Sequence, residues 1–168
     1  MIVTGGHLQV PACCLSAAGN AVSGKGRQRI MTETKDYVRK VQYYETDRMG
    51  IVHHSNYIRW FEEARVDLLE QLGYGYDRIE AEGFGSPVLE VCCKYKTMAH
   101  FGDMVSISAH IIEYNGVRMA LRYEVRDAQT GELRCEGESR HCFMGREGRP
   151  VSLKRSWPAL DQVFAAQL

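Results

Sequence analysis

The 168-residue chain lacks an excess of charge of either sign and has only four prolines. Lysine and arginine total 21 and aspartate and glutamate total 21, so the formal net charge is zero. A nucleic-acid or membrane-surface partner would favour a basic excess, so we expect neither. No apolar run approaches the roughly 20 residues of a membrane span. We therefore expect a soluble, cytoplasmic protein.

The six cysteines lack the spacing of a metal site. They contain no Cys-x-x-Cys motif, and they are Cys13, Cys14, Cys92, Cys93, Cys135 and Cys142. Cys92 and Cys93 fall in a strand-like stretch, where neighbouring side chains point to opposite faces and cannot easily share one metal ion. We therefore expect no metal, and free thiols in a reducing compartment.

The first 30 residues differ in composition from the rest. They are rich in glycine, alanine and serine, and they show no period of a helix or a strand. The short apolar stretch Val10 to Leu15 has no basic residue before it, unlike a secretory signal. We expect residues 1–30 to be a disordered leader or a mis-called start, with a targeting peptide as the alternative. Residues 31–168 are then a single domain, of ordinary size for one core.

One long helix is predicted from the period of its apolar residues. They recur at helical spacing, at Tyr57, Trp60, Phe61, Ala64, Leu68 and Leu72. Charged residues occupy the opposite face, at Arg59, Glu62, Glu63, Asp67 and Glu70. Ser55 or Asn56 is expected to cap the start of this helix, and Gly73 to end it.

The remaining regular segments alternate between apolar and polar residues and therefore indicate strands. We expect them at about residues 37–43, 89–96, 105–111, 117–126 and 133–144. Asn115-Gly116 lies between two of them and predicts a hairpin, and a short helix is possible at 157–164. One helix cannot supply the crossovers of a parallel sheet, so we expect an α+β fold in which it covers an antiparallel sheet.

The chemistry concentrates in the segment before the long helix, residues 43–57. A helix N-terminus presents unpaired N–H groups and a partial positive charge, which suit an oxygen that becomes negative during acyl transfer. Asp47 precedes this terminus, and Gly50 between them allows a tight turn. Asp47 could therefore act as a general base on water or attack a thioester carbonyl itself.

This segment resembles the signature of the 4-hydroxybenzoyl-CoA thioesterase-like hotdog family, which includes the Tol-Pal-associated acyl-CoA thioesterases. The resemblance is carried by the pattern Thr46-Asp47-x-x-Gly50-x-Val52-x-His54-x-x-Tyr57-x-x-Trp60-x-Glu62-x-Ala64-Arg65. It continues in Tyr95 with Asp103, in Gly131, and in Gly148-Arg149-Pro150.

The resemblance implies a hotdog fold, in which a sheet wraps round one helix, and an acyl-CoA thioesterase activity without metal or prosthetic group. It also implies a homodimer or homotetramer with active sites at the subunit interface. The catalytic carboxylate of the family maps onto Asp47 and its histidine onto His54. The backbone N–H near Tyr57 corresponds to the group that polarises the carbonyl, and Gly50 is placed with Tyr57 in the substrate-binding segment.

Structural roles remain open for each of these residues. Asp47 could cap a turn, His54 could orient substrate, tune Asp47 or be structural, and His53 is expected to be structural. Glu62 could be a second carboxylate of the site, but a solvated position or an ion pair with Arg65 is favoured.

The arginines are candidates for binding the phosphates of CoA, although a solvated sheet face explains most of them. They are Arg118, Arg122, Arg126, Arg140, Arg146 and Arg149. Two other functions stay open: a hotdog hydratase or dehydratase that acts on acyl-CoA, and a non-catalytic module that binds acyl groups.

Overall fold

The computed structural model describes residues 34–168. The expected leader, residues 1–30, lies outside the described residues, as do Cys13, Cys14 and the lower boundary of the expected domain. The elements are β1 (Tyr37–Lys40), η1 (Tyr43–Glu45), α1 (Ser55–Gln71), α2 (Tyr76–Ala81), β2 (Val88–Tyr95), β3 (Met104–Tyr114), β4 (Arg118–Asp127), β5 (Leu133–Cys142), α3 (Leu153–Ser156) and α4 (Pro158–Ala165).

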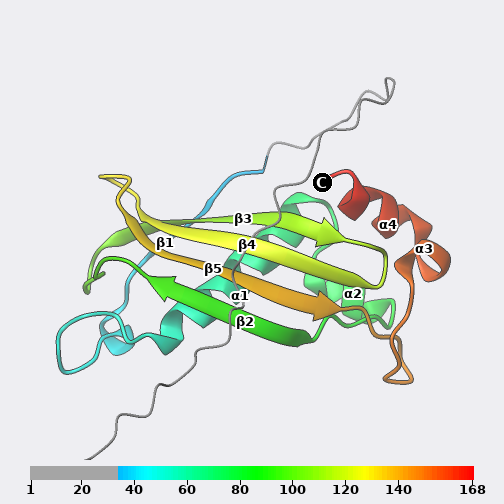
Figure 1. Ribbon diagram of the computed structural model, residues 1–168, viewed down its shortest axis with the longest axis horizontal. Helices are drawn as coiled ribbons and strands as arrows, with labels where there is room; N and C mark the ends of the chain where they lie inside the picture. Colours follow the sequence, from blue (N-terminus) through cyan, green and yellow to red (C-terminus); the bar gives the residue numbers. More distant parts are fainter. Residues whose placement is uncertain (1–33) are drawn as a thin grey trace, which may run out of the picture.

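The strands form one five-stranded sheet in the order β1-β3-β4-β5-β2, and every neighbouring pair is antiparallel. In Figure 1 the helix α1 runs along one face of this sheet, and α3 and α4 lie at the end opposite the loop that precedes α1. The expected hairpin joins β3 to β4. Asn115 Oδ1 accepts the N–H groups of Val117 (3.0 Å) and Arg118 (2.8 Å) there, while Gly116 has a φ of +87°. The predicted α+β architecture is confirmed.

The predicted apolar stripe of α1 is the face that the sheet covers, and every residue named for it is buried. At its centre the ring of Phe61 stacks on that of Tyr123 in β4, with centroids 4.5 Å apart. Gly137 of β5 makes this close approach possible. A methyl group there would clash with the Phe61 ring and would lie 2.5 Å from the carbonyl oxygen of Cys92. The contact fixes the height of α1 above the sheet.

Three local expectations were wrong. The strand predicted over residues 37–43 ends at Lys40, because the chain turns into the 3₁₀ helix η1 at Tyr43. The glycine-rich connection after α1 contains a further helix, α2, whose Ile79 is buried in the core. Neither Ser55 nor Asn56 caps α1: the N-cap residue is His54, without a side-chain capping bond.

Candidate active site

Asp47 lies in a tight turn that leads back toward α1. Its N–H donates to the carbonyl of Ile51 (2.9 Å), and its carbonyl accepts the N–H of Gly50 (2.9 Å). One carboxylate oxygen also accepts the N–H of Met49 at 2.7 Å. Gly50 has a φ of +75°, a conformation that glycine adopts without the cost of a Cβ. Asp47 therefore does cap this turn, and its side chain is only partly buried.

The start of α1 supplies the expected hydrogen-bond donors. Tyr57 is the third residue of the helix, so its N–H belongs to the first turn, where N–H groups have no intrahelical partner by position. The side chain of Tyr57 is 4% exposed, and burial raises the pKa of its hydroxyl to about 12. Tyr57 thus presents its backbone to the loop while its ring packs in the core.

The two histidines before α1 lie on the surface and touch each other, with ring centroids 4.1 Å apart. His53 has a structural contact: its Nδ1 is 2.8 Å from the hydroxyl of Ser55. His54 lies on the same loop as Asp47, but within residues 34–168 no hydrogen bond or ion pair joins their side chains. The direct role of His54 therefore stays a prediction.

Tyr95, at the end of β2, forms a wall of the same region. Its hydroxyl donates to the carbonyl of His54 (3.1 Å), and its ring lies 5.3 Å from that of Tyr57. Burial, followed by the nearby Cys93 thiol, raises the pKa of Tyr95, so the hydroxyl stays protonated as a donor. A hydrogen bond with Cys135 lowers the pKa of Cys93 to about 7. The sequence pattern included Tyr95 but did not indicate this contact.

Sequence reasoning missed Glu45, which anchors the loop to the helix. Its carboxylate is 4% exposed and accepts bonds from Arg39 (2.7 Å), Trp60 Nε1 (2.8 Å) and the N–H of Gln42 (2.7 Å). Its carbonyl accepts the Asn56 side-chain amide at 2.7 Å. The signal in the sequence is the spacing of Gln42 and Glu45, which form a capping box around η1.

The arrangement is therefore a partly buried carboxylate on a tight turn of the loop that leads into α1, whose first turn supplies backbone N–H donors. The profile of the thioesterase-like superfamily matches residues 41–168, which include this loop, α1 and four of the five strands. The chain belongs to the thioesterase-like superfamily.

Individual relatives agree with this family. YneP of Bacillus subtilis (strain 168), to which an acyl-CoA thioesterase activity is ascribed, is 34% identical over 120 residues, which are 71% of this chain and 86% of YneP. The acyl-CoA thioester hydrolase YbgC of Escherichia coli O6:H1 is 26% identical over 90 residues, 54% of this chain and 67% of YbgC.

A solved structure, the DHNA-CoA thioesterase of Staphylococcus aureus, superposes with a TM-score of 0.75 at 29% identity. It covers 78% of this chain and 88% of its own. The hotdog fold expected from the sequence is thereby confirmed.

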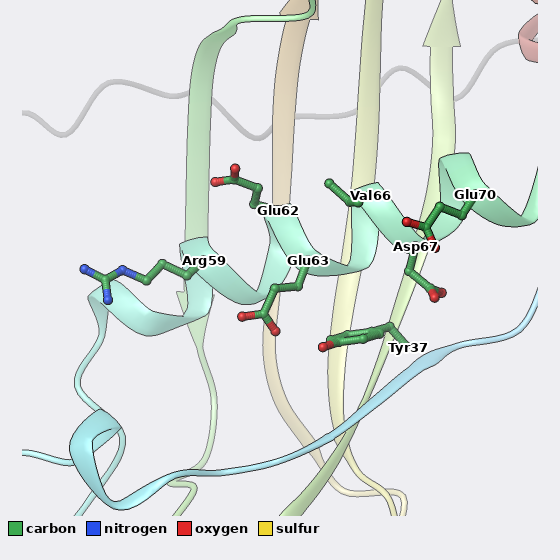
Figure 2. A pocket seen from close by; sticks show the side chains of 7 residues that line it. All are labelled: Tyr37, Arg59, Glu62, Glu63, Val66, Asp67 and Glu70. Atoms are coloured by element: carbon green, nitrogen blue, oxygen red, sulfur yellow. The ribbon is translucent and has the colours of Figure 1, made fainter. Parts of the chain in front are cut away.

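A hollow of about 440 Å³ lies elsewhere on this thioesterase-like domain, along the outer face of α1 (Figure 2). Its lining is strongly acidic and consists of Tyr37, Arg59, Glu62, Glu63, Val66, Asp67 and Glu70. Four carboxylates against one guanidinium repel phosphate groups, so this hollow does not suit CoA. Glu62 faces it and is exposed, as the solvated alternative predicted. The suggested ion pair of Glu62 with Arg65 does not form within the described residues, since Arg65 is buried while Glu62 is exposed.

Several of the candidate arginines already have carboxylate partners. Arg122 pairs with Glu138 at 3.0 Å and Arg126 with Glu124 at 2.8 Å, while Arg140 lies 2.8 Å from Glu113. This charge-balanced outer sheet face is the solvated surface that the alternation predicted. Within the described range, no cluster of three or more His, Cys, Asp or Glu is arranged to hold a metal ion. Nor does that range contain a helix long and apolar enough to cross a membrane.

Proposed function

We propose that this protein hydrolyses acyl-CoA thioesters to a carboxylic acid and free CoA, with Asp47 as the catalytic carboxylate. The observation that carries the proposal is the placement of Asp47 on a glycine-dependent turn of the loop that leads into α1. Relatives whose names describe acyl-CoA or DHNA-CoA thioesterases support the same reaction.

In this mechanism the thioester oxygen docks on the first-turn N–H groups of α1 at Tyr57, because the N–H groups of Ser55 and Asn56 already donate to His53. These donors and the helix dipole stabilise the negative charge that develops on the oxygen. Asp47 then removes a proton from a water molecule whose oxygen attacks the carbonyl carbon, or the carboxylate itself attacks that carbon to form an anhydride that water opens. Either route expels the CoA thiolate, which takes up a proton. His54, the N-cap residue of α1, orients the substrate or tunes the reactivity of Asp47.

We further propose that two subunits pair through β2, which the resemblance also implies. β2 is an edge strand of eight residues, so one row of its N–H and C=O groups faces outward. Val88 and Leu89 on it are 56% and 54% exposed, so pairing through this strand would cover apolar surface that the single chain leaves open. Static light scattering tests this pairing: the wild type should be a dimer or tetramer, and Leu89→Lys should shift it to the monomer.

The decisive test is release of free thiol from a series of aliphatic and aromatic acyl-CoAs, with Asp47→Asn beside the wild type. An asparagine keeps the oxygen that accepts the Met49 N–H, so the turn survives while the carboxylate is lost. We expect an unchanged melting temperature and a fall in kcat of about 10²–10⁴-fold.

Asp103→Asn is the matched control, because Asp103 also caps a turn, by accepting the His100 N–H at 2.8 Å. It should retain wild-type turnover. Equal losses in the two variants would remove Asp47 from the mechanism.

The same experiment separates the two rival functions. A hydratase or dehydratase would change the absorbance of an enoyl-CoA without releasing thiol. A binding module would bind acyl-CoA without turnover in either variant. The 4-hydroxybenzoyl-CoA-like, Tol-Pal-associated subtype, the cytoplasmic location and the independence from cofactors stay predictions.

A further inference from the structure

Arg65 is a buried cation without a carboxylate partner. It points from α1 into the interior, is 5% exposed, and forms no ion pair with any residue of the described range. Its Nη1 atom is buried and has no hydrogen-bond partner there. Its guanidinium lies over the ring of Tyr76, 5.4 Å from the centroid. A cation–π contact of this kind offsets only part of the cost of burying a charge.

The polar groups around Arg65 do not neutralise it. Ser139 Oγ is 2.8 Å from the Tyr123 hydroxyl and 2.7 Å from Nε2 of His141, and Nδ1 of His141 is 3.4 Å from the carbonyl oxygen of Ser86. Each of these groups can therefore find a partner within the chain Tyr123–Ser139–His141–Ser86. Burial, followed by the Arg65 charge, lowers the pKa of His141 to about 4, so the imidazole is neutral at pH 7.

A second buried polar atom without a hydrogen-bond partner among the described residues belongs to Ser86. Ser86 is 5% exposed, and its hydroxyl oxygen also has no hydrogen-bond partner. Ser86 and Arg65 both adjoin His141, one through the hydrogen bond and the other through its charge. Buried polar atoms in folded proteins are nearly always hydrogen-bonded, so two unpartnered atoms in residues that both interact with His141 point to a polar group that binds there. An acceptor oxygen satisfies both the guanidinium and the hydroxyl donor, and an anionic one also neutralises the unpaired charge of Arg65.

Arg65 and the candidate active site are reached along the same helix, α1, and the same strand, β2. Tyr95 pairs with Cys135 at the end of β2 beside Tyr57, and Val88 pairs with His141 at the other end. Arg65 follows Tyr57 by eight residues, which corresponds to about 12 Å along the helix. Val91 and Cys93, between these ends of β2, are only partly covered.

We infer that Arg65, with the hydroxyl of Ser86, binds an anionic group at the far end of the acyl chain, so that the preferred substrates are CoA thioesters of dicarboxylic acids. The inference rests on the proposed thioesterase function and names its substrate class. In the bound state the terminal carboxylate accepts hydrogen bonds from the guanidinium and the serine hydroxyl, while the thioester lies at the start of α1.

The test compares kcat/KM for pairs of equal chain length, adipyl-CoA against hexanoyl-CoA and suberyl-CoA against octanoyl-CoA. Wild-type protein should prefer the carboxylated member of the better pair by about 10- to 100-fold, as expected for hydrogen bonds between charged groups. Arg65→Met should bring this ratio close to one, Arg65→Lys should restore part of it, and Ser86→Ala should reduce it. Arg59→Met is the control, because Arg59 is exposed on the same helix and should leave the ratio unchanged.

Wild-type hydrolysis without a preference for the carboxylated members would overturn the inference, because an ordered water would then suffice for the two unpartnered atoms. A preference that survives in Arg65→Met would overturn it as well. If Arg65→Met does not fold, Ser86→Ala decides by the same ratio.

Absence of hydrolysis from every thioester would instead contradict the proposed function. The inference is then decided by the melting temperature in adipate and suberate. Either dianion should raise it for wild type and not for Ser86→Ala, and no shift would refute the inference.

Discussion

The buried carboxylate of Glu45 should contribute more to stability than any exposed charge near the site. It accepts three hydrogen bonds, from Arg39, Trp60 and the Gln42 backbone, at 2.7–2.8 Å. Glu45→Gln preserves the size of the side chain but removes the charge. It also leaves one acceptor oxygen where there were two, and it places an amide donor among groups that are themselves donors.

The magnitude follows from what remains around Arg39. Removing one partner of a buried ion pair costs about 3–5 kcal/mol. Arg39 keeps its second carboxylate, Glu63, at 2.6 Å, so we expect the lower end, about 3 kcal/mol. For a domain of this size such a loss lowers Tm by about 10 °C.

Urea unfolding followed by tryptophan fluorescence measures this loss. The fluorescence of Trp60 reports on the environment of Glu45, because its indole N–H donates a hydrogen bond to the Glu45 carboxylate. Glu63→Gln is the matched control: it removes the other carboxylate of the same arginine, but Glu63 is 40% exposed and should cost less than about 1 kcal/mol. Equal urea midpoints for the two variants would refute the reasoning, since burial would then make no difference.

Three further outcomes are expected. The lowered pKa of His141, about 4 against an ordinary 6.5, implies stability that is present above pH 6.5 and lost as the pH falls toward 4. Urea titrations at pH 7 and pH 4 should show a fall of about 3 kcal/mol in the free energy of unfolding, and this fall should be absent in His141→Gln. Gly137→Ala should lower stability by about 1–3 kcal/mol in thermal melts, because its methyl group meets the Phe61 ring; an unchanged Tm would contradict this packing. Cys93 should react with iodoacetamide half-maximally near pH 7 by mass spectrometry, and a midpoint near pH 9 would exclude the thiol contact.

Most of the fold could be predicted from the sequence because its strands alternate cleanly and the long helix α1 has a continuous apolar stripe. The chain between Gly73 and Gly85 was harder. Its helix α2 has six residues, too few for a helical period to stand out among glycines. The end of β1 at Lys40 could not be predicted either, because residues 41–43 continue the strand-like pattern up to the start of η1 at Tyr43.

For the site, the position of Asp47 before a helix start could be predicted, because both features are local in sequence. The partners of Glu45 could not. Arg39 and Trp60 lie six and fifteen residues away from it on different elements, and only folding brings the three together. The isolation of Arg65 was likewise invisible, since Glu62 at i−3 offered a plausible partner in sequence.

The order of strands in the sheet has a consequence for how the molecule folds. β3, β4 and β5 follow one another in the chain and pair as consecutive hairpins, whereas β1 pairs with β3 across some seventy residues, Val38 with Ser106 for example. Contacts between neighbouring segments cost less loop-closure entropy and form earlier. The three-stranded meander is therefore a natural nucleus, onto which β1, the Asp47 loop and α1 dock late. Amide hydrogen exchange should then be slowest in β4 and faster around Asp47, so that the site can open locally while the meander persists.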